Sequence, residues 1–152
     1  MFYFWAVAEA AVESGFTLEF PYKRSLGPVV GAFLGGLYER RIVGVRTAEG
    51  RVICPPFEYD PDTGDATGEL VDLPETGTVH EWAWVSRPLR KHPLDRPFAW
   101  ALVQIDGADT RMLHAVDAGD RGRIARGVRV KVRWADETRG HITDIACFEP
   151  VG

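Results

Sequence analysis

The chain has 152 residues, of which 45% are hydrophobic and 26% charged, and its formal net charge is −4. This composition is typical of one soluble globular domain, or of two small modules that share a core. The acidic balance argues against a protein that binds polyanions over its whole surface, because such proteins carry a basic excess. No apolar run reaches the roughly 18–20 residues that a membrane span requires.

The cysteine content and the start of the chain narrow the class further. Cys54 and Cys147 are the two cysteines, too few for a four-thiolate zinc site or a disulfide framework. We expect both to be reduced thiols in the core. The apolar residues 1–8 have no cationic lead and are followed by Glu9, which argues against a signal peptide. The expected location is the cytoplasm, and no cofactor is expected.

Residues 2–13 predict a first helix, rich in aromatic residues and alanine and ended by Gly15. This helix is apolar all round, so more than one of its faces needs burial. Two arrangements satisfy this requirement. The helix docks on its own domain, or it forms an arm that is buried in another subunit.

A second helix is better marked. Ser25 offers an N-cap, Pro28 suits the first turn, and Arg40 and Arg41 suit the C-terminal end. A broad apolar face lies between these signals, formed by Val29, Val30, Phe33, Leu34 and Leu37.

Glycines recur every four residues along the second helix, at Gly27, Gly31 and Gly35. Each glycine inside a helix costs about 1 kcal/mol relative to alanine, so a compensating contact is expected. Close approach of another subunit's backbone is one explanation, and packing inside the domain is the other.

The rest of the chain divides into a loop-rich segment and a strand-rich segment. Residues 42–76 contain short apolar pieces between turn signals, with too few apolar residues for a separate core. Alternating residues predict five strands, with a tight hairpin at 106–109: 78–85, 98–105, 111–116, 128–134 and 140–148. The expected fold is mainly β: an OB-type barrel with N-terminal helices, divided into an arm (1–41), a ribbon-like segment (42–76) and the barrel (77–152).

Six cations without an acid follow the third predicted strand: Arg121, Arg123, Arg126, Arg129, Lys131 and Arg133. A solvated strand face is one interpretation, and a site for an anionic ligand or an acidic partner is another. Single-stranded nucleic acid is the third, but Trp134 falls in phase with the buried valines, where it cannot stack on bases. His114 and Asp117 suggest an orienting pair, although no nucleophile lies near them in the sequence.

Several fragments, in this order and spacing, resemble one protein family. They are residues 33–37 (FLGGL), 41–46 (RIVGVR), 50–56 (GRVICPP), 97–103 (PFAWALV) and 126–130 (RGVRV). The family is a domain-of-unknown-function family of OB-fold proteins that accompany thiolase-like enzymes. The resemblance covers residues 21–150 and implies an N-terminal helix, a rubredoxin-like zinc ribbon and a C-terminal OB barrel.

The sequence departs from this family at the zinc ribbon. The four positions where the family usually has cysteines read Arg46, Glu49, Asp60 and Thr63, and Cys54 lies outside them. Because thiolate ligands are missing, we expect a degenerate ribbon without zinc. Arg46, Glu49 and Asp60 are expected to clip the ribbon together by charge instead.

Residues 92–100 (HPLDRPFAW) and 113–117 (LHAVD) resemble a subgroup without these cysteines, which pairs with steroid side-chain aldolases of actinobacteria. In that subgroup a sterol-carrier-protein-type thiolase homologue cleaves a β-hydroxyacyl-CoA by retro-aldol chemistry. The related domain occurs fused to a MaoC-like hydratase or as a separate subunit. The resemblance implies a non-catalytic accessory subunit, in a heterotetramer around an aldolase dimer, with the hydratase as a further candidate partner.

Two sets of residues are candidates for contacts in such a complex. The partner interface is expected on the second helix, at Gly31, Phe33, Leu34, Gly35, Leu37 and Tyr38. The phosphates of coenzyme A are expected near Arg121, Arg123 and Arg129. The alternative functions are an acyl-CoA-binding or substrate-channelling module of a hydratase–aldolase complex, and a single-stranded nucleic-acid-binding OB fold.

Overall fold

The computed structural model describes residues 14–152, so the helix expected at residues 2–13 lies outside the described residues. One α-helix, eight strands and two short 3₁₀ helices follow in chain order. They are α1 (Pro28–Tyr38), β1 (Ile42–Arg46), β2 (Val52–Ile53), β3 (Glu69–Leu73), β4 (Thr76–Val85), β5 (Phe98–Ile105), β6 (Met112–Val116), η1 (Arg121–Arg123), β7 (Arg129–Trp134), η2 (Ile142–Asp144) and β8 (Ile145–Pro150). Within residues 14–152, no helix is long and apolar enough to cross a membrane.

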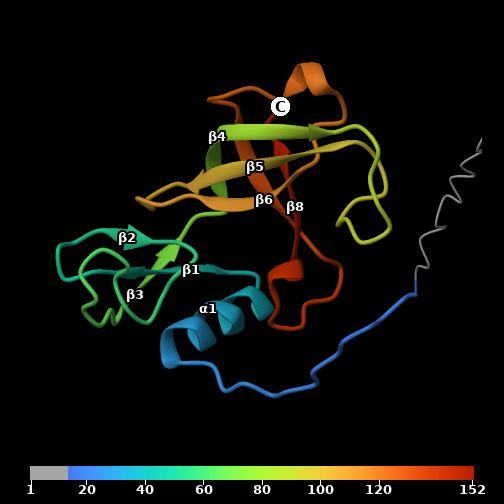
Figure 1. The fold of residues 1–152 in the computed structure, drawn as a ribbon. Helices are drawn as coiled ribbons and strands as arrows, with labels where there is room; N and C mark the ends of the chain where they lie inside the picture. The colour runs from blue at the N-terminus through green and yellow to red at the C-terminus, as the bar shows by residue number, and fades with distance from the viewer. Residues whose placement is uncertain (1–13) are drawn as a thin grey trace, which may run out of the picture.

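Five strands close into a barrel in the order β4-β5-β6-β8-β7 (Figure 1). Neighbouring strands are antiparallel except β6 and β8, which are parallel. This is the arrangement of an OB fold, and it confirms the predicted mainly β fold class. The predicted hairpin is also confirmed: Ala108 donates its N–H to the carbonyl of Ile105 (3.0 Å), and Gly107 adopts a φ of +86°.

The last strand begins later than predicted. Residues expected to open it form η2 instead, because the buried carboxylate of Asp144 accepts three backbone N–H groups. These come from Arg139 (2.9 Å), Gly140 (2.7 Å) and His141 (3.1 Å). The turn they form moves the start of β8 to Ile145.

Helix α1 has a different cap from the one predicted. Gly27, not Ser25, is the N-cap residue, and it provides no side-chain cap. The carboxylate of Glu58 accepts the N–H groups of Val29 (2.9 Å) and Val30 (3.0 Å). A carboxylate at this end of a helix also interacts favourably with the helix dipole. At the other end, Arg40 and Arg41 lie beyond the last helical residue, Tyr38.

Helix α1 and a three-stranded sheet, in the order β2-β1-β3, lie at one end of the barrel (Figure 1). Phe33 and Leu37 of α1, Ile42 of β1 and Cys54 belong to the same core cluster as the barrel side chains. Val29, Val45 and Ile53 form a small second cluster between the helix and the sheet. The ribbon-like segment therefore depends on the barrel and α1 for most of its burial.

Candidate functional site

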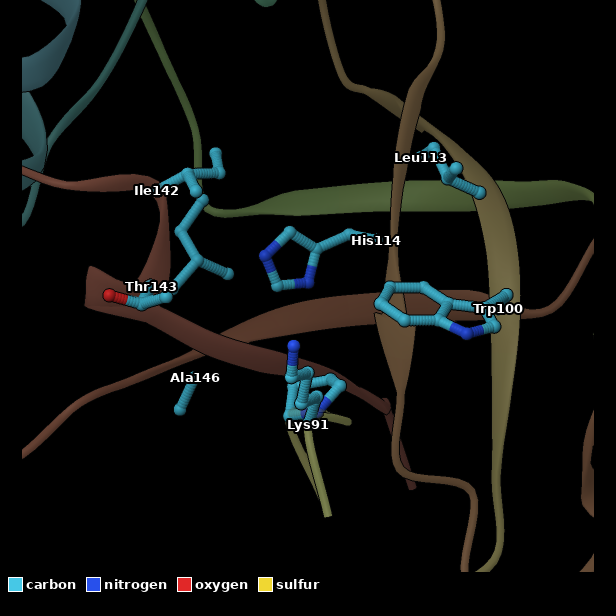
Figure 2. A pocket seen from close by; sticks show the side chains of 9 residues that line it. Lys91, Trp100, Leu113, His114, Ile142, Thr143 and Ala146 are labelled. Atoms are coloured by element: carbon cyan, nitrogen blue, oxygen red, sulfur yellow. The ribbon is translucent and has the colours of Figure 1, made fainter. Parts of the chain in front are cut away.

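A pocket of about 520 Å³ opens on one side of the barrel (Figure 2). Its lining comes from the loop between β4 and β5, from β5 and β6, and from η2 and β8. The lining residues are Lys91, Pro93, Trp100, Leu113, His114, Ile142, Thr143, Ile145 and Ala146. A volume of this size lies within the range of small-molecule sites.

The position of the pocket in the fold is that of an OB-fold ligand face. OB folds bind ligands on their second and third strands, between the loop joining strands one and two and the loop joining strands four and five. In this barrel the second and third strands are β5 and β6, and the two loops are residues 86–97 and 135–144. All four of these segments line the pocket as this rule predicts, and β8 adds Ile145 and Ala146 to the lining.

His114 forms the floor of the pocket between Ile142 and Trp100 (Figure 2). The side chain is buried, and the Ala115 N–H donates to its Nδ1 (2.9 Å). Burial lowers the pKa of His114, and its hydrogen bonds with the backbone of Ala115 and Ile142 offset part of this shift. The imidazole is therefore neutral at pH 7, and it packs edge-on against Phe148 with 5.5 Å between ring centroids.

The loop before β5 is fixed to the barrel by a shared carboxylate. Asp117, whose side chain is 8% exposed, forms ion pairs with Arg96 and with Arg133, the latter at 2.9 Å. Its hydrogen bond from Arg96 is the main cause of the lowered pKa of Asp117, with Arg133 contributing and burial opposing. Because Asp117 is held by these two arginines, the orienting pair suggested for His114 and Asp117 does not form.

The aromatic wall of the pocket is also fixed. Trp100 packs edge-on against Phe98 (5.3 Å between centroids) and His92 (6.2 Å). The ring of His92 accepts the N–H of Leu89 at Nδ1 (3.1 Å), which holds the loop turn in place. These contacts hold the apolar wall of the pocket in place. The wall is suited to binding an apolar group.

The thiols lie in the core, as predicted. Both are free and buried. Burial raises the pKa of Cys54 to about 12 and that of Cys147 to about 11, so both remain protonated at neutral pH. Within residues 14–152, no three His, Cys, Asp or Glu side chains gather in a group that could hold a metal ion.

The predicted partner interface on α1 divides into buried and outward residues. Phe33 and Leu37 pack in the chain's own core and are 5% and 0% exposed, which removes both side chains from the predicted surface. Leu34 is partly buried and Tyr38 is exposed. A Cβ added at Gly31 or Gly35 would meet no atom of residues 14–152 within 4 Å, so packing within this part of the chain does not explain these two glycines.

The predicted cationic row is largely neutralised by acids of neighbouring segments. Arg129 pairs with Asp106, and Lys131 pairs with Glu149 (3.5 Å). Arg126 and Arg133 also have acidic partners, Glu81 and Asp117. Val130 and Val132 are buried and Trp134 packs partly buried against the same core, in the predicted phase.

Arg121 and Arg123 differ from the rest of the row. They lie on η1 and are exposed, and they form no ion pair with any residue between 14 and 152. Of the three predicted coenzyme A contacts, Arg129 is thus occupied by Asp106 and the other two are accessible.

The predicted charge clip of the ribbon is wrong in its partners. Arg46 pairs with Glu69 of β3 (3.3 Å), and not with Glu49 or Asp60. Asp60 is buried, and its carboxylate accepts the N–H of Asp62 (2.9 Å). The hydroxyl of Thr63 accepts the N–H of Asp65 (3.2 Å), so both side chains stabilise the same turn. The loop between β1 and β2 is linked to the loop between β2 and β3 by the ion pair of Arg51 with Asp62.

The pocket itself was not predicted from the sequence. Its residues lie up to 55 positions apart in the sequence, from Lys91 to Ala146, and no motif connects them. Leu113 is the local signal for the pocket, because strand alternation turns this leucine outward between Met112 and His114 of β6. In the structure its side chain is 63% exposed, whereas both neighbours are buried. Combined with the OB topology, that exposed leucine on the third strand would have indicated the face.

Comparisons with known proteins agree with this fold. A family model described as the C-terminal OB-fold domain of ChsH2 matches residues 70–135. Seven chains of solved structures match. One, described as the Ltp2-ChsH2(DUF35) aldolase, is 20% identical with a TM-score of 0.60, over 84% of this chain and 98% of that chain. No curated protein sequence matches.

A second solved structure is a protein of unknown function from the DUF35 family of Sulfolobus solfataricus. It is 19% identical with a TM-score of 0.57, over 70% of this chain and 77% of that chain. Together with the family model, these likenesses confirm the predicted resemblance to an OB-fold family of unknown function.

Proposed function

We propose that this chain, which carries a ChsH2-type C-terminal OB-fold domain, is a non-catalytic accessory subunit of an aldolase complex. The observation that carries the proposal is the likeness to a chain of the Ltp2-ChsH2(DUF35) aldolase, which extends over 98% of that chain. The match includes more than the barrel, since it covers 84% of the present chain. The pocket of this chain adds support, because its apolar wall is suited to binding.

The partner in this proposal is a thiolase-fold aldolase of the sterol-carrier-protein type. It would act on a steroid or another β-hydroxyacyl-CoA, and the retro-aldol cleavage would take place in the partner. A heterotetramer around an aldolase dimer, with a MaoC-like hydratase as a further partner, completes the proposal. We place the complex in the cytoplasm, which the two free thiols fit.

The outward side of α1 is the proposed contact surface. Among residues 14–152 no atom fills the space beside Gly31 and Gly35, and Leu34 and Tyr38 flank them on the helix. Small residues allow the backbone of a second helix or strand to approach closely, which would compensate for the weak helix propensity of glycine. Phe33 and Leu37 support this surface from inside.

A single substitution on this surface tests the proposal. Gly35→Leu should weaken the purified complex with a thiolase-fold partner by about tenfold or more. The isolated chain should keep its melting temperature, because a Cβ at this position meets no atom of residues 14–152 within 4 Å. Gly68→Leu is the matched control, since Gly68 is equally open but lies outside α1. Equal affinity of the two variants would place the interface elsewhere.

An acyl-CoA-binding or channelling module is the second candidate, favoured by the accessible Arg121 and Arg123. Arg121→Gln with Arg123→Gln should then weaken coenzyme A binding and reduce its dependence on salt. Arg126→Gln, which removes a cation already paired with Glu81, is the control. The neutralised row gives no support to nucleic-acid binding, and we do not propose it.

A further inference from the structure

The barrel pocket combines an apolar body with a single positive charge. Its apolar lining includes Trp100, Leu113, Ile142, Ile145 and Ala146. Among its nine lining residues, all within the described part of the chain, none is acidic and Lys91 alone is cationic. His114 contributes no charge, because burial keeps its imidazole neutral at pH 7.

Lys91 is placed to reach a bound molecule. It enters from the loop between β4 and β5, and its amine points toward the floor of the pocket (Figure 2). It forms no ion pair with any of residues 14–152, so its charge is available. Leu113 is exposed at the rim, on the side of Trp100, where it would cover an apolar ligand.

The pocket is preformed, which favours a small molecule over an adaptable protein surface. Loop 86–97 is fixed by the ion pair between Arg96 and Asp117, and η2 by the three N–H groups that Asp144 accepts. Sites for small molecules are concave, mostly apolar and provided with few polar groups that fix orientation. The pocket meets each of these conditions with residues on the OB-fold ligand face.

We propose that this pocket binds a small hydrophobic anion, with its apolar body against Trp100, Leu113 and Ile142 and its negative group at Lys91. This proposal does not depend on the proposed accessory role, and the arginines of η1 do not line the site. The site belongs to this chain alone, so it can be tested without a partner subunit.

Two fluorescent probes of nearly the same shape test the proposal on the full chain. Anilinonaphthalene sulfonate carries a negative charge, and phenylnaphthylamine is its uncharged counterpart. All proteins carry Phe16→Ser and Phe20→Ser, because these two side chains are exposed and would bind either probe nonspecifically. We expect the sulfonate to bind more tightly than the neutral probe, and dodecanoate to displace it.

Two variants assign the signal to the pocket. Lys91→Gln should weaken binding of the sulfonate about three- to fivefold, the upper part of the range of an exposed ion pair, and leave the neutral probe nearly unchanged. Lys23→Gln is the control for charge. Ala146→Phe, which fills the pocket, should weaken both probes about tenfold or more. Ala48→Phe, at an exposed alanine of the β1–β2 turn, is the control for added surface.

Several results would overturn the proposal. Equal effects of Lys91→Gln and Lys23→Gln would remove the role of Lys91. Unchanged probe binding in Ala146→Phe would place the probes elsewhere. Leu113→Ser replaces Ala146→Phe should the latter fail to fold, and it too must weaken both probes.

Discussion

Asp106 joins three strands of the barrel through one carboxylate. It lies directly after β5, accepts the hydroxyl of Thr76 at the start of β4 (2.6 Å), and forms an ion pair with Arg129 of β7. The hydrogen bond from Arg129, followed by that from Thr76, lowers the pKa of Asp106 from 3.8 to about 2. This carboxylate therefore stabilises the closed end of the barrel in its ionised form.

The lowered pKa of Asp106 predicts a specific dependence of stability on pH. The unfolded chain takes up the proton more readily, so the stabilisation is fully present above about pH 4 and is lost as pH falls through about 2. Asp106→Asn should lower the urea midpoint at pH 7 and flatten its decline between pH 4 and 2. Urea unfolding of both proteins at pH 7, 4 and 2 measures these midpoints. A variant whose midpoint declines as steeply as that of the parent chain would contradict it.

At the scale of the element, the glycines of α1 have opposite environments. A Cβ at Gly36 would lie 2.7 Å from Cγ2 of Val43 and 3.1 Å from the carbonyl of Arg41, whereas a Cβ at Gly31 would meet nothing within 4 Å. Gly36 thus allows the helix to pack closely on β1. Among the described residues, none packs against the position that a Cβ of Gly31 would occupy.

Alanine at these two positions should act in opposite directions. Gly36→Ala should lower the free energy of unfolding by about 1–3 kcal/mol, since it overpacks the contact with β1. Gly31→Ala should raise it by about 0.5–1 kcal/mol through helix propensity. Urea denaturation of the isolated chain measures both. Loss of stability in Gly31→Ala would show that the outward face of α1 is packed after all.

The N-terminal end of α1 depends on a residue far away in the sequence. Glu58 accepts the N–H groups of Val29 and Val30, which no residue between 14 and 27 does. Glu58→Ala should lower the free energy of unfolding by about 0.5–2 kcal/mol, the usual loss for a helix cap. Glu58→Gln should lose less, because its amide oxygen still accepts. Equal stability of Glu58→Ala and the parent chain would refute this role.

At the scale of the whole molecule, local patterns predicted the barrel well. Alternation predicted β7 within one residue, since Val130 and Val132 enter the core while Arg129 and Lys131 remain outside. The hairpin at Asp106 followed from turn chemistry alone. Its strands are adjacent in the sequence, so short-range signals were sufficient.

Features made by distant segments could not be predicted in this way. Ser25 looked like the cap of α1 because only its neighbours were visible, and the true cap arrives from residue 58. The pocket brings Lys91, His114 and Ile142 together from three segments that no motif connects. The sequence alone places Phe33 and Leu37 at a partner interface, because the barrel residues that cover them lie much later in the chain.

The central claim is that this chain is the accessory subunit of a thiolase-fold aldolase. A tagged full-length chain, recovered from its native cells and examined by native mass spectrometry, tests it most directly. We predict one thiolase-fold subunit for each copy of this chain, with the assembly lost in Gly35→Leu and kept in Gly68→Leu. Recovery of the chain alone, or with partners of any other fold, would contradict the claim.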